Sequence, residues 1–184
     1  TLLRADVIDS NPLSTASLPI KEFFKKYEGF MSNENEREVK NANEAAGDRA
    51  AKAFGELLRR QPKGNSILDS LDIAQNVFAN FPTATTRYLI VFSDMVENSE
   101  RYRFTNLNLQ EDNVREFISV EERGARLPDL SSVQAYVVGA GATRGADATP
   151  ERTRMISDFW LAYFEAAGAT LPSSRYGPTL ITFP

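Results

Sequence analysis

Two residue types are absent from this chain of 184 residues, and each absence excludes a class of site. Without cysteine, the chain has no disulfides, no thiolate metal sites and no cysteine nucleophile. Without histidine, it lacks the usual general base, the commonest ligand of transition metals and any Ser-His-Asp triad. A metal bound here would need oxygen ligands, which favour magnesium, calcium or manganese over zinc.

The chain also lacks long apolar runs and an excess of positive charge. No run approaches the roughly 20 apolar residues of a membrane-spanning helix, so we expect no membrane span. The net charge is −4, which is opposite in sign to a surface that binds phosphates and argues against a nucleic-acid partner. A cysteine-free chain suits cytoplasm and periplasm alike, so the compartment stays open.

The remaining composition is that of an ordinary globular protein. Hydrophobic residues make up 42% and charged residues 25% of the chain. A chain of this length can bury a large core without disulfides or metals, and we expect a single domain over residues 1–184.

The most informative stretch is Arg87–Asp94, a continuous apolar run that ends in Ser93 and Asp94. A run without alternation predicts a strand buried on both faces, as in the middle of a parallel sheet. Asp94 then falls at the carboxyl end of the strand, where open α/β sheets bind ligands. Asp94 is therefore the first candidate for a ligand site, and the alternative is that it caps the turn that follows.

Periodicity and turn residues place the other elements. Predicted helices run from the Asn33 cap to about residue 60 and over 67–81, 111–121 and 150–167, and predicted strands cover 2–8, 13–20, 132–139 and 179–183. The first two strands are expected to form a hairpin at one side of the sheet, followed by an irregular segment over residues 21–35. From residue 66 onward helices and strands alternate, which predicts an α/β fold with a parallel sheet.

Ser66 is the second candidate, because it directly precedes the predicted helix 67–81. A helix N-cap is the ordinary role of serine at this place, although Ser66 and Asp69 match the capping box only loosely. Capping is compatible with metal contact, since the helix start lies near the same edge of the sheet.

Two other polar segments are interpreted as surface. Glu97 and the polar residues up to Arg101 follow a strand end closely, and such residues are often solvated; the alternative is a role in supporting the residues of the site. The stretch Gly139–Arg144 lacks the third glycine of the dinucleotide fingerprint, so it is interpreted as a surface loop rather than a phosphate site.

Two blocks of the sequence, Asn65–Leu71 and Tyr88–Met95, resemble a known family. They are similar to the second half of a von Willebrand factor A-type (VWA-like) domain of the bacterial kind, in which a helix start precedes a strand ending in Ser-Asp-Met or Ser-Asp-Gly. The later stretches Tyr136–Gly141, Phe159–Trp160 and Tyr176–Gly177 also fit. The resemblance implies a doubly wound, mostly parallel sheet with one antiparallel edge strand and helices on both faces.

The resemblance also implies a metal site. In the family, an Asp-x-Ser-x-Ser loop, a threonine and an aspartate hold magnesium or manganese, and a carboxylate of the partner commonly completes the coordination. Carried over by position, Asp94 would be the aspartate, and Ser66 would stand in place of the threonine and keep its hydroxyl.

The Asp-x-Ser-x-Ser loop itself is absent. Asp6–Ser10 does not fit it, because Ile8 replaces the first serine. By pattern, residues 2–8 match the family's second strand, and the first strand would lie beside the strand 87–93. We therefore expect about 30–45 further residues before Thr1, enough for a strand and a helix, or another segment that fills this slot.

Three functions stay open at this point. The leading hypothesis is a VWA-like module that binds another protein, with Mg²⁺ or Mn²⁺ held by Ser66 and Asp94, and it favours a binding role over an enzymatic one. The second is a metal-dependent hydrolase or nucleotide-binding enzyme that uses Asp94 and neighbouring carboxylates, since a site without histidine would need carboxylate–metal chemistry. The third is a structural subunit with no metal.

Overall fold

The protein is described by a computed structural model over residues 2–5, 20–24, 33–57, 59, 65–99, 102–142 and 149–179. These residues form a mixed α/β fold, which confirms the predicted class at this level. In chain order the elements are β1 (Leu2–Ala5), β2 (Ile20–Phe23), α1 (Asn33–Leu57), α2 (Ile67–Ala79), β3 (Arg87–Phe92), η1 (Phe104–Asn106), α3 (Glu111–Arg123), β4 (Val133–Val138), α4 (Pro150–Ala166), η3 (Ser173–Arg175) and β5 (Tyr176–Gly177).

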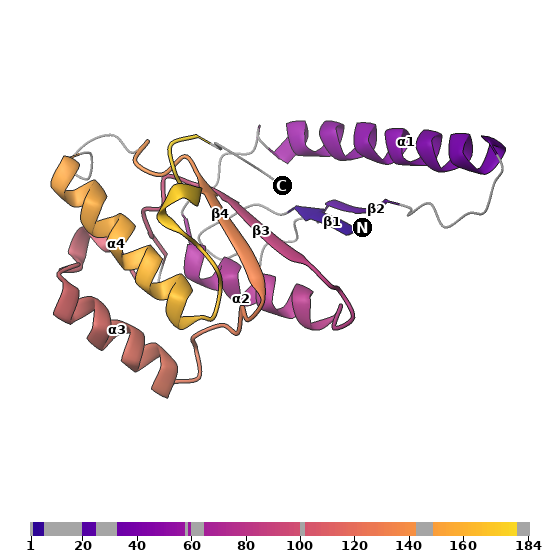
Figure 1. The fold of residues 1–184 in the computed structure, drawn as a ribbon. Coiled ribbons are helices and arrows are strands. Elements are labelled where there is room, and N and C mark those ends of the chain that lie inside the picture. The colour runs from indigo at the N-terminus through magenta and orange to yellow at the C-terminus, as the bar shows by residue number, and fades with distance from the viewer. Residues whose placement is uncertain are drawn as a thin grey trace.

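The described strands form two sheets. β1 and β2 make an antiparallel pair, and β3, β4 and β5 make a parallel sheet in the order β3-β4-β5. α1 runs alongside the hairpin, at the other end of the molecule from α3 and α4 (Figure 1). The Arg49 guanidinium of α1 donates two charge-assisted hydrogen bonds, of 3.0 and 2.9 Å, to the Glu22 carboxylate of β2. A single doubly wound sheet remains a prediction.

The hairpin is present, but its second strand is not where the sequence predicted it. β2 covers Ile20–Phe23, inside the segment 21–35 that was expected to be irregular. Pairing with β1 satisfies the backbone hydrogen bonds of this segment, so tertiary contact decides its conformation rather than its local composition. Residues 6–19, which hold the predicted turn and most of the predicted strand 13–20, lie outside the described residues.

Helix starts are the best-predicted local features. α2 begins directly after Ser66, as predicted. Thr149 caps α4 by accepting a hydrogen bond from the Arg152 amide at 3.2 Å, and Pro150 occupies the first turn, where its missing N–H costs nothing. The predicted strand 179–183 falls almost wholly outside the described residues, and the last strand seen is β5. No helix in the described part of the chain is long and apolar enough to cross a membrane.

The core lies between one face of the parallel sheet and the helices α2, α3 and α4. Its buried members include Ile67, Leu68, Leu71, Val91, Val114, Val133, Ala135, Val137, Ile156, Phe159, Trp160, Tyr163 and Phe164. The aromatic cluster of α4 was predicted to face the core, and this is confirmed. Trp160 also donates its indole N–H to the carbonyl of Met95 at 2.7 Å, which anchors the loop after β3 to α4.

The prediction that strand 87–93 is buried on both faces is wrong. Leu89 packs against the core and Val91 is part of it, but Tyr88 and Phe92, on the opposite face, are 41% and 54% exposed. Successive side chains of a strand point to opposite faces, and a continuous apolar run does not tell whether something covers the second face. β3 is also the end strand of its sheet among the described residues.

Candidate functional site

Asp94 lies at the carboxyl end of β3, as predicted, and is partly exposed. Its Oδ1 accepts a hydrogen bond from the Val96 amide at 3.1 Å, so it does cap the turn that follows its strand. The next residue, Met95, is fully buried with a φ of 67°, a left-handed conformation that is unfavourable for a residue with a side chain. Strained backbone of this kind is typical of functional sites, where the surrounding structure holds a residue in an unfavourable conformation.

The loop before α2 is tied to the loop after β3 through Asn65. The backbones of Asn65 and Asn98 exchange two hydrogen bonds of 3.1 and 2.8 Å. The side-chain amide of Asn65 also donates to the Ser93 hydroxyl at 3.3 Å and to the Val96 carbonyl at 3.1 Å. The structure therefore brings the segments that carry Ser66 and Asp94 together at one edge of the sheet.

Ser66 occupies the N-cap position of α2, but its hydroxyl does not cap the helix. The side chain is fully buried, and its Oγ donates to Asp69 Oδ2 at 2.6 Å. The predicted serine cap is thus right in position and wrong in its hydrogen bond. For this hydroxyl to bind a metal, it would have to turn away from Asp69.

Glu97 supplies the cap that Ser66 does not. Its Oε2 accepts hydrogen bonds from the amides of Ile67 at 2.7 Å and Leu68 at 3.2 Å, the first two of α2. The expectation that Glu97 is solvated is wrong, because this side chain is fully buried. Its hydrogen bonds to the start of α2 are contacts between distant parts of the chain, which the local sequence does not reveal.

Burial leaves Glu97 in an unusual electrostatic state. Loss of hydration raises the pKa of its carboxyl to about 7, and the negative charge of Asp69 adds to the rise, while the Ser99 hydroxyl and the two helix amides oppose it. Among the described residues, its second oxygen, Oε1, accepts no hydrogen bond. The Ser99 hydroxyl is close, but it donates to the Tyr102 carbonyl instead.

The neighbouring strands complete this edge. Burial raises the pKa of Tyr176 on β5, and the negative charges of Asp94 and Asp158 add to the rise, so the tyrosine lies within electrostatic reach of the candidate carboxylate. Gly139 ends β4 with a φ of 97°, and a Cβ there would lie 3.1 Å from the Ser93 carbonyl oxygen. Only glycine suits a backbone that is left-handed and this close to the end of β3.

The loop after Gly139 is held at its start rather than loose. The amides of Gly139 and Ala140 both donate to the Gly177 carbonyl of β5, at 3.0 and 3.1 Å. The predicted surface loop over Gly139–Arg144 is therefore tied to the sheet in its first residues, and residues 143–148 lie outside the described residues.

Phe92 is the feature of this edge that the sequence did not predict. It lies two residues before Asp94 and exposes 54% of its surface, and Tyr88 on the same face of β3 exposes 41%. Large exposed apolar side chains on one strand face, one of them two residues from a partly exposed carboxylate, are the kind of surface that proteins use to contact one another. The exposure of these two side chains is the signal, and it becomes visible only in three dimensions.

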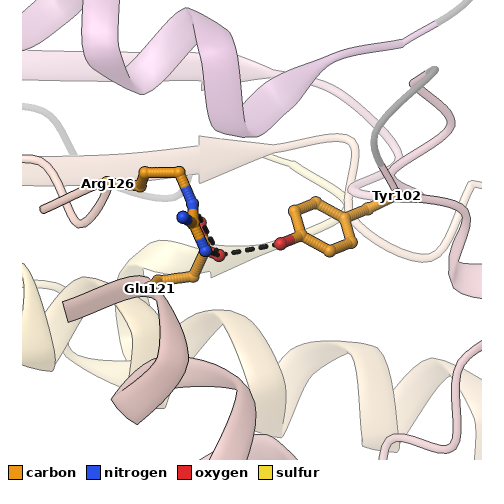
Figure 2. Close-up of polar contacts among 3 residues, drawn as sticks. All are labelled: Tyr102, Glu121 and Arg126. Carbon is orange, nitrogen blue, oxygen red and sulfur yellow. Dashed lines mark hydrogen bonds and ion pairs between the residues drawn. The ribbon is translucent and has the colours of Figure 1, made fainter. Parts of the chain in front are cut away.

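A second buried carboxylate, Glu121 of α3, shows what a fully compensated one looks like (Figure 2). Its Oε1 accepts the Tyr102 hydroxyl at 2.7 Å and two N–H groups of Arg126 at 3.2 and 2.8 Å. This arrangement pins the end of α3 to the segment before η1, and it neutralises the charge that is buried. Glu121 is thus a structural element, and it provides a control for Glu97.

The structure places the two metal ligands predicted from the sequence on adjoining loops. Ser66 and Asp94 carry oxygen atoms, the ligand type that a hard cation such as Mg²⁺ prefers. Mg²⁺ demands octahedral coordination, so waters and a partner carboxylate would have to supply the other positions. Among the residues that the structure describes, no group of three or more carboxylates could hold a metal.

Comparisons of the chain with family models, with curated proteins and with solved structures gave no match.

Proposed function

We propose that this protein is a VWA-like interaction module that binds another protein through the edge of the sheet around Asp94. The observation that carries the proposal is the exposure of Phe92, two residues before that carboxylate, and of Tyr88 on the same face of β3. Burial of an apolar side chain by a partner supplies binding energy, and a charged group nearby orients the partner. In this way a few residues can dominate the binding energy of an interface. The rigid support beneath this edge, from the Trp160 bond to Met95, favours a preorganised docking surface.

Site-specific photo-crosslinking in cells that produce the full-length protein tests this proposal. A benzoylphenylalanine at position 92 is expected to give a discrete adduct with a partner protein. The matched control carries the same probe at Val120, which is 40% exposed on α3. Adducts of equal strength at both positions, or none at position 92, would contradict the proposal.

Asp94 provides the second arm of the same experiment. With the probe kept at position 92, Asp94→Asn is expected to reduce the adduct at least severalfold, because the substitution keeps the shape and the turn hydrogen bond but removes the charge. An adduct that is unchanged in Asp94→Asn would mean that Phe92 contacts a partner without the candidate site.

We further propose that a divalent cation, Mg²⁺ or Mn²⁺, takes part at this edge, held by Asp94 and Ser66. The supporting observation is the Asn65 tie, which places the two loops side by side. Calorimetric titration of the full-length protein with Mg²⁺ tests this part, with Asp94→Ala as the control. Equal heats for both proteins would rule out Asp94 as a ligand and leave metal-free docking.

The hydrolase or nucleotide-binding alternative and the metal-free structural subunit remain predictions from the sequence. No contact among the described residues favours the first, since Asp94 and Glu97 are engaged with backbone amides. The crosslinking result distinguishes a metal-free structural subunit from a module that docks on a partner protein.

A further inference from the structure

We propose that Glu97 is a positioning residue for this edge: its buried carboxylate joins the start of α2, which carries Ser66, to the loop after β3, which carries Asp94. The inference deepens the proposed function and rests on it, because the proposed function is what gives this edge of the sheet a role. The contacts that carry it are independent of any partner or metal.

The first step of the argument is the choice of cap. Serine at an N-cap ordinarily accepts a hydrogen bond from an amide in the first turn. Ser66 instead donates to Asp69, while Glu97, thirty residues away along the chain, accepts from the Ile67 amide at 2.7 Å. A local cap was available, but the chain uses a long-range one, and only the long-range cap connects two segments.

The second step is that Glu97 is itself held on both sides. Its carbonyl accepts the amide of Phe104 at 3.0 Å, and its neighbour Asn98 exchanges two backbone hydrogen bonds with Asn65. Phe104 is fully buried in the core. Because the backbone of Glu97 is fixed in this way, movement of its carboxylate would move the start of α2 relative to the loop after β3.

The third step is the cost. A buried carboxylate with one oxygen that accepts no hydrogen bond among the described residues is unfavourable, and an apolar residue with a serine cap would avoid this cost. Asp69 of α2 is the charged group that acts on Glu97, and its sign makes the burial worse. A costly arrangement that stabilises a strained loop, with Met95 in a left-handed conformation, indicates that the relative placement of the two segments matters.

Backbone amide NMR of the full chain tests the proposal with Glu97→Ala, Glu97→Gln and, as the matched control, Glu121→Gln. In Glu97→Ala, exchange of the Ile67 and Leu68 amides is expected to accelerate about tenfold, and exchange of the Asn65 and Asn98 amides, which join the two segments, is expected to accelerate with it. Glu97→Gln keeps a carbonyl acceptor, so it is expected to restore most of the protection. Glu121→Gln is expected to leave both segments unchanged.

A plain cap would behave differently from a positioning residue. If Glu97→Ala accelerates exchange at Ile67 and Leu68 and leaves the Asn65 and Asn98 amides as protected as before, the two segments are not coupled and the proposal is overturned. Should Glu97→Ala not fold, Glu97→Asp replaces it, because the shorter side chain withdraws the carboxylate from the Ile67 and Leu68 amides. The same loss of protection is then expected, and a loss confined to Ile67 and Leu68 overturns the proposal equally.

Addition of Mn²⁺ to the same samples separates this proposal from the proposed function. Paramagnetic broadening of resonances around Ser66 and Asp94 together is expected in the unsubstituted protein, and loss of the Ser66 component is expected in Glu97→Ala. Absence of broadening at both residues would count against the metal site alone, since the exchange result decides the role of Glu97.

Discussion

Glu97 and Glu121 are both buried, yet the protein compensates them in different ways. Glu121 receives a cation and a phenol from Arg126 and Tyr102, so its charge is neutralised where it lies. Glu97 receives the backbone amides that begin α2, and among the described residues no cation pairs with it and its Oε1 accepts no hydrogen bond. The first arrangement stabilises a helix end, and the second joins two loops at the edge where Asp94 lies.

The difference shows that a buried glutamate can have two distinct structural roles. A carboxylate with a cation beside it is a fixed charge that holds its neighbours in place. A carboxylate with backbone amides alone stays close to the balance between its charged and neutral forms, because no cation compensates the lost hydration. The region around Glu97 is therefore the more responsive of the two, and pH and substitution are the means to test it.

The largest expected effect comes from pH. The pKa of Glu97 is about 7 in the folded protein against 4.5 for an ordinary glutamate, so between these values the folded state keeps a proton that the unfolded chain releases. Its contribution to stability is complete below pH 4.5, falls as the pH rises toward 7 and is constant above. A difference of this size corresponds to about 3 kcal/mol.

Chemical denaturation of the unsubstituted protein and of Glu97→Gln across this range measures the effect. The free energy of unfolding of the first, minus that of the second, is expected to decrease from pH 4.5 to pH 7. The glutamine does not titrate, and the other carboxylates contribute to both curves. A difference that stays constant with pH would show that the two helix amides fully replace the lost hydration.

The next effect is the loss of the compensated carboxylate. Glu121→Ala leaves Arg126 and the Tyr102 hydroxyl without this acceptor and removes buried volume, so unfolding is expected to require about 2 kcal/mol less. The figure is smaller than for a fully buried pair, because the Arg126 side chain is 41% exposed and water can solvate it. Thermal or urea unfolding measures the change. A loss below a few tenths of a kcal/mol would remove Glu121 from the comparison.

The smallest effect isolates a single donor. Tyr102→Phe removes the hydroxyl that donates to Glu121 at 2.7 Å but keeps the ring, which packs edge-on against Phe117 with centroids 4.9 Å apart. Because Arg126 still serves the carboxylate, a loss of about 1 kcal/mol is expected in urea unfolding. A loss as large as that of Glu121→Ala would instead assign the stability of this cluster to the phenol.

Local signals in the sequence were enough for much of the fold. Thr149 and Pro150 mark the start of α4, and Ser66 marks the start of α2, because capping depends on residues next to each other in the chain. The place of β3 was equally clear from its apolar run. β2 was missed, since a polar segment becomes a strand only when β1 supplies its hydrogen-bond partners.

The candidate site was predictable in part. Asp94 follows from the general rule that ligands bind at the carboxyl ends of parallel strands, and the structure places it there. Glu97 could not be found in this way, because its role depends on a contact with Ile67 across thirty residues. The exposure of Phe92 was equally hidden, since an apolar residue in an apolar run looks the same whether or not its face is covered.

The exposed apolar side chains of β3 also have a consequence for handling the protein. The strand Arg87–Phe92 is six residues long, contains no proline and has Arg87 as its only charge, at one end. In the described residues it is the last strand of its sheet, with β4 as its strand neighbour. Such a segment is a template for self-association, so concentrated solutions are expected to aggregate first through this strand. A lysine in place of Tyr88 or Phe92 is the substitution that should keep the protein dispersed.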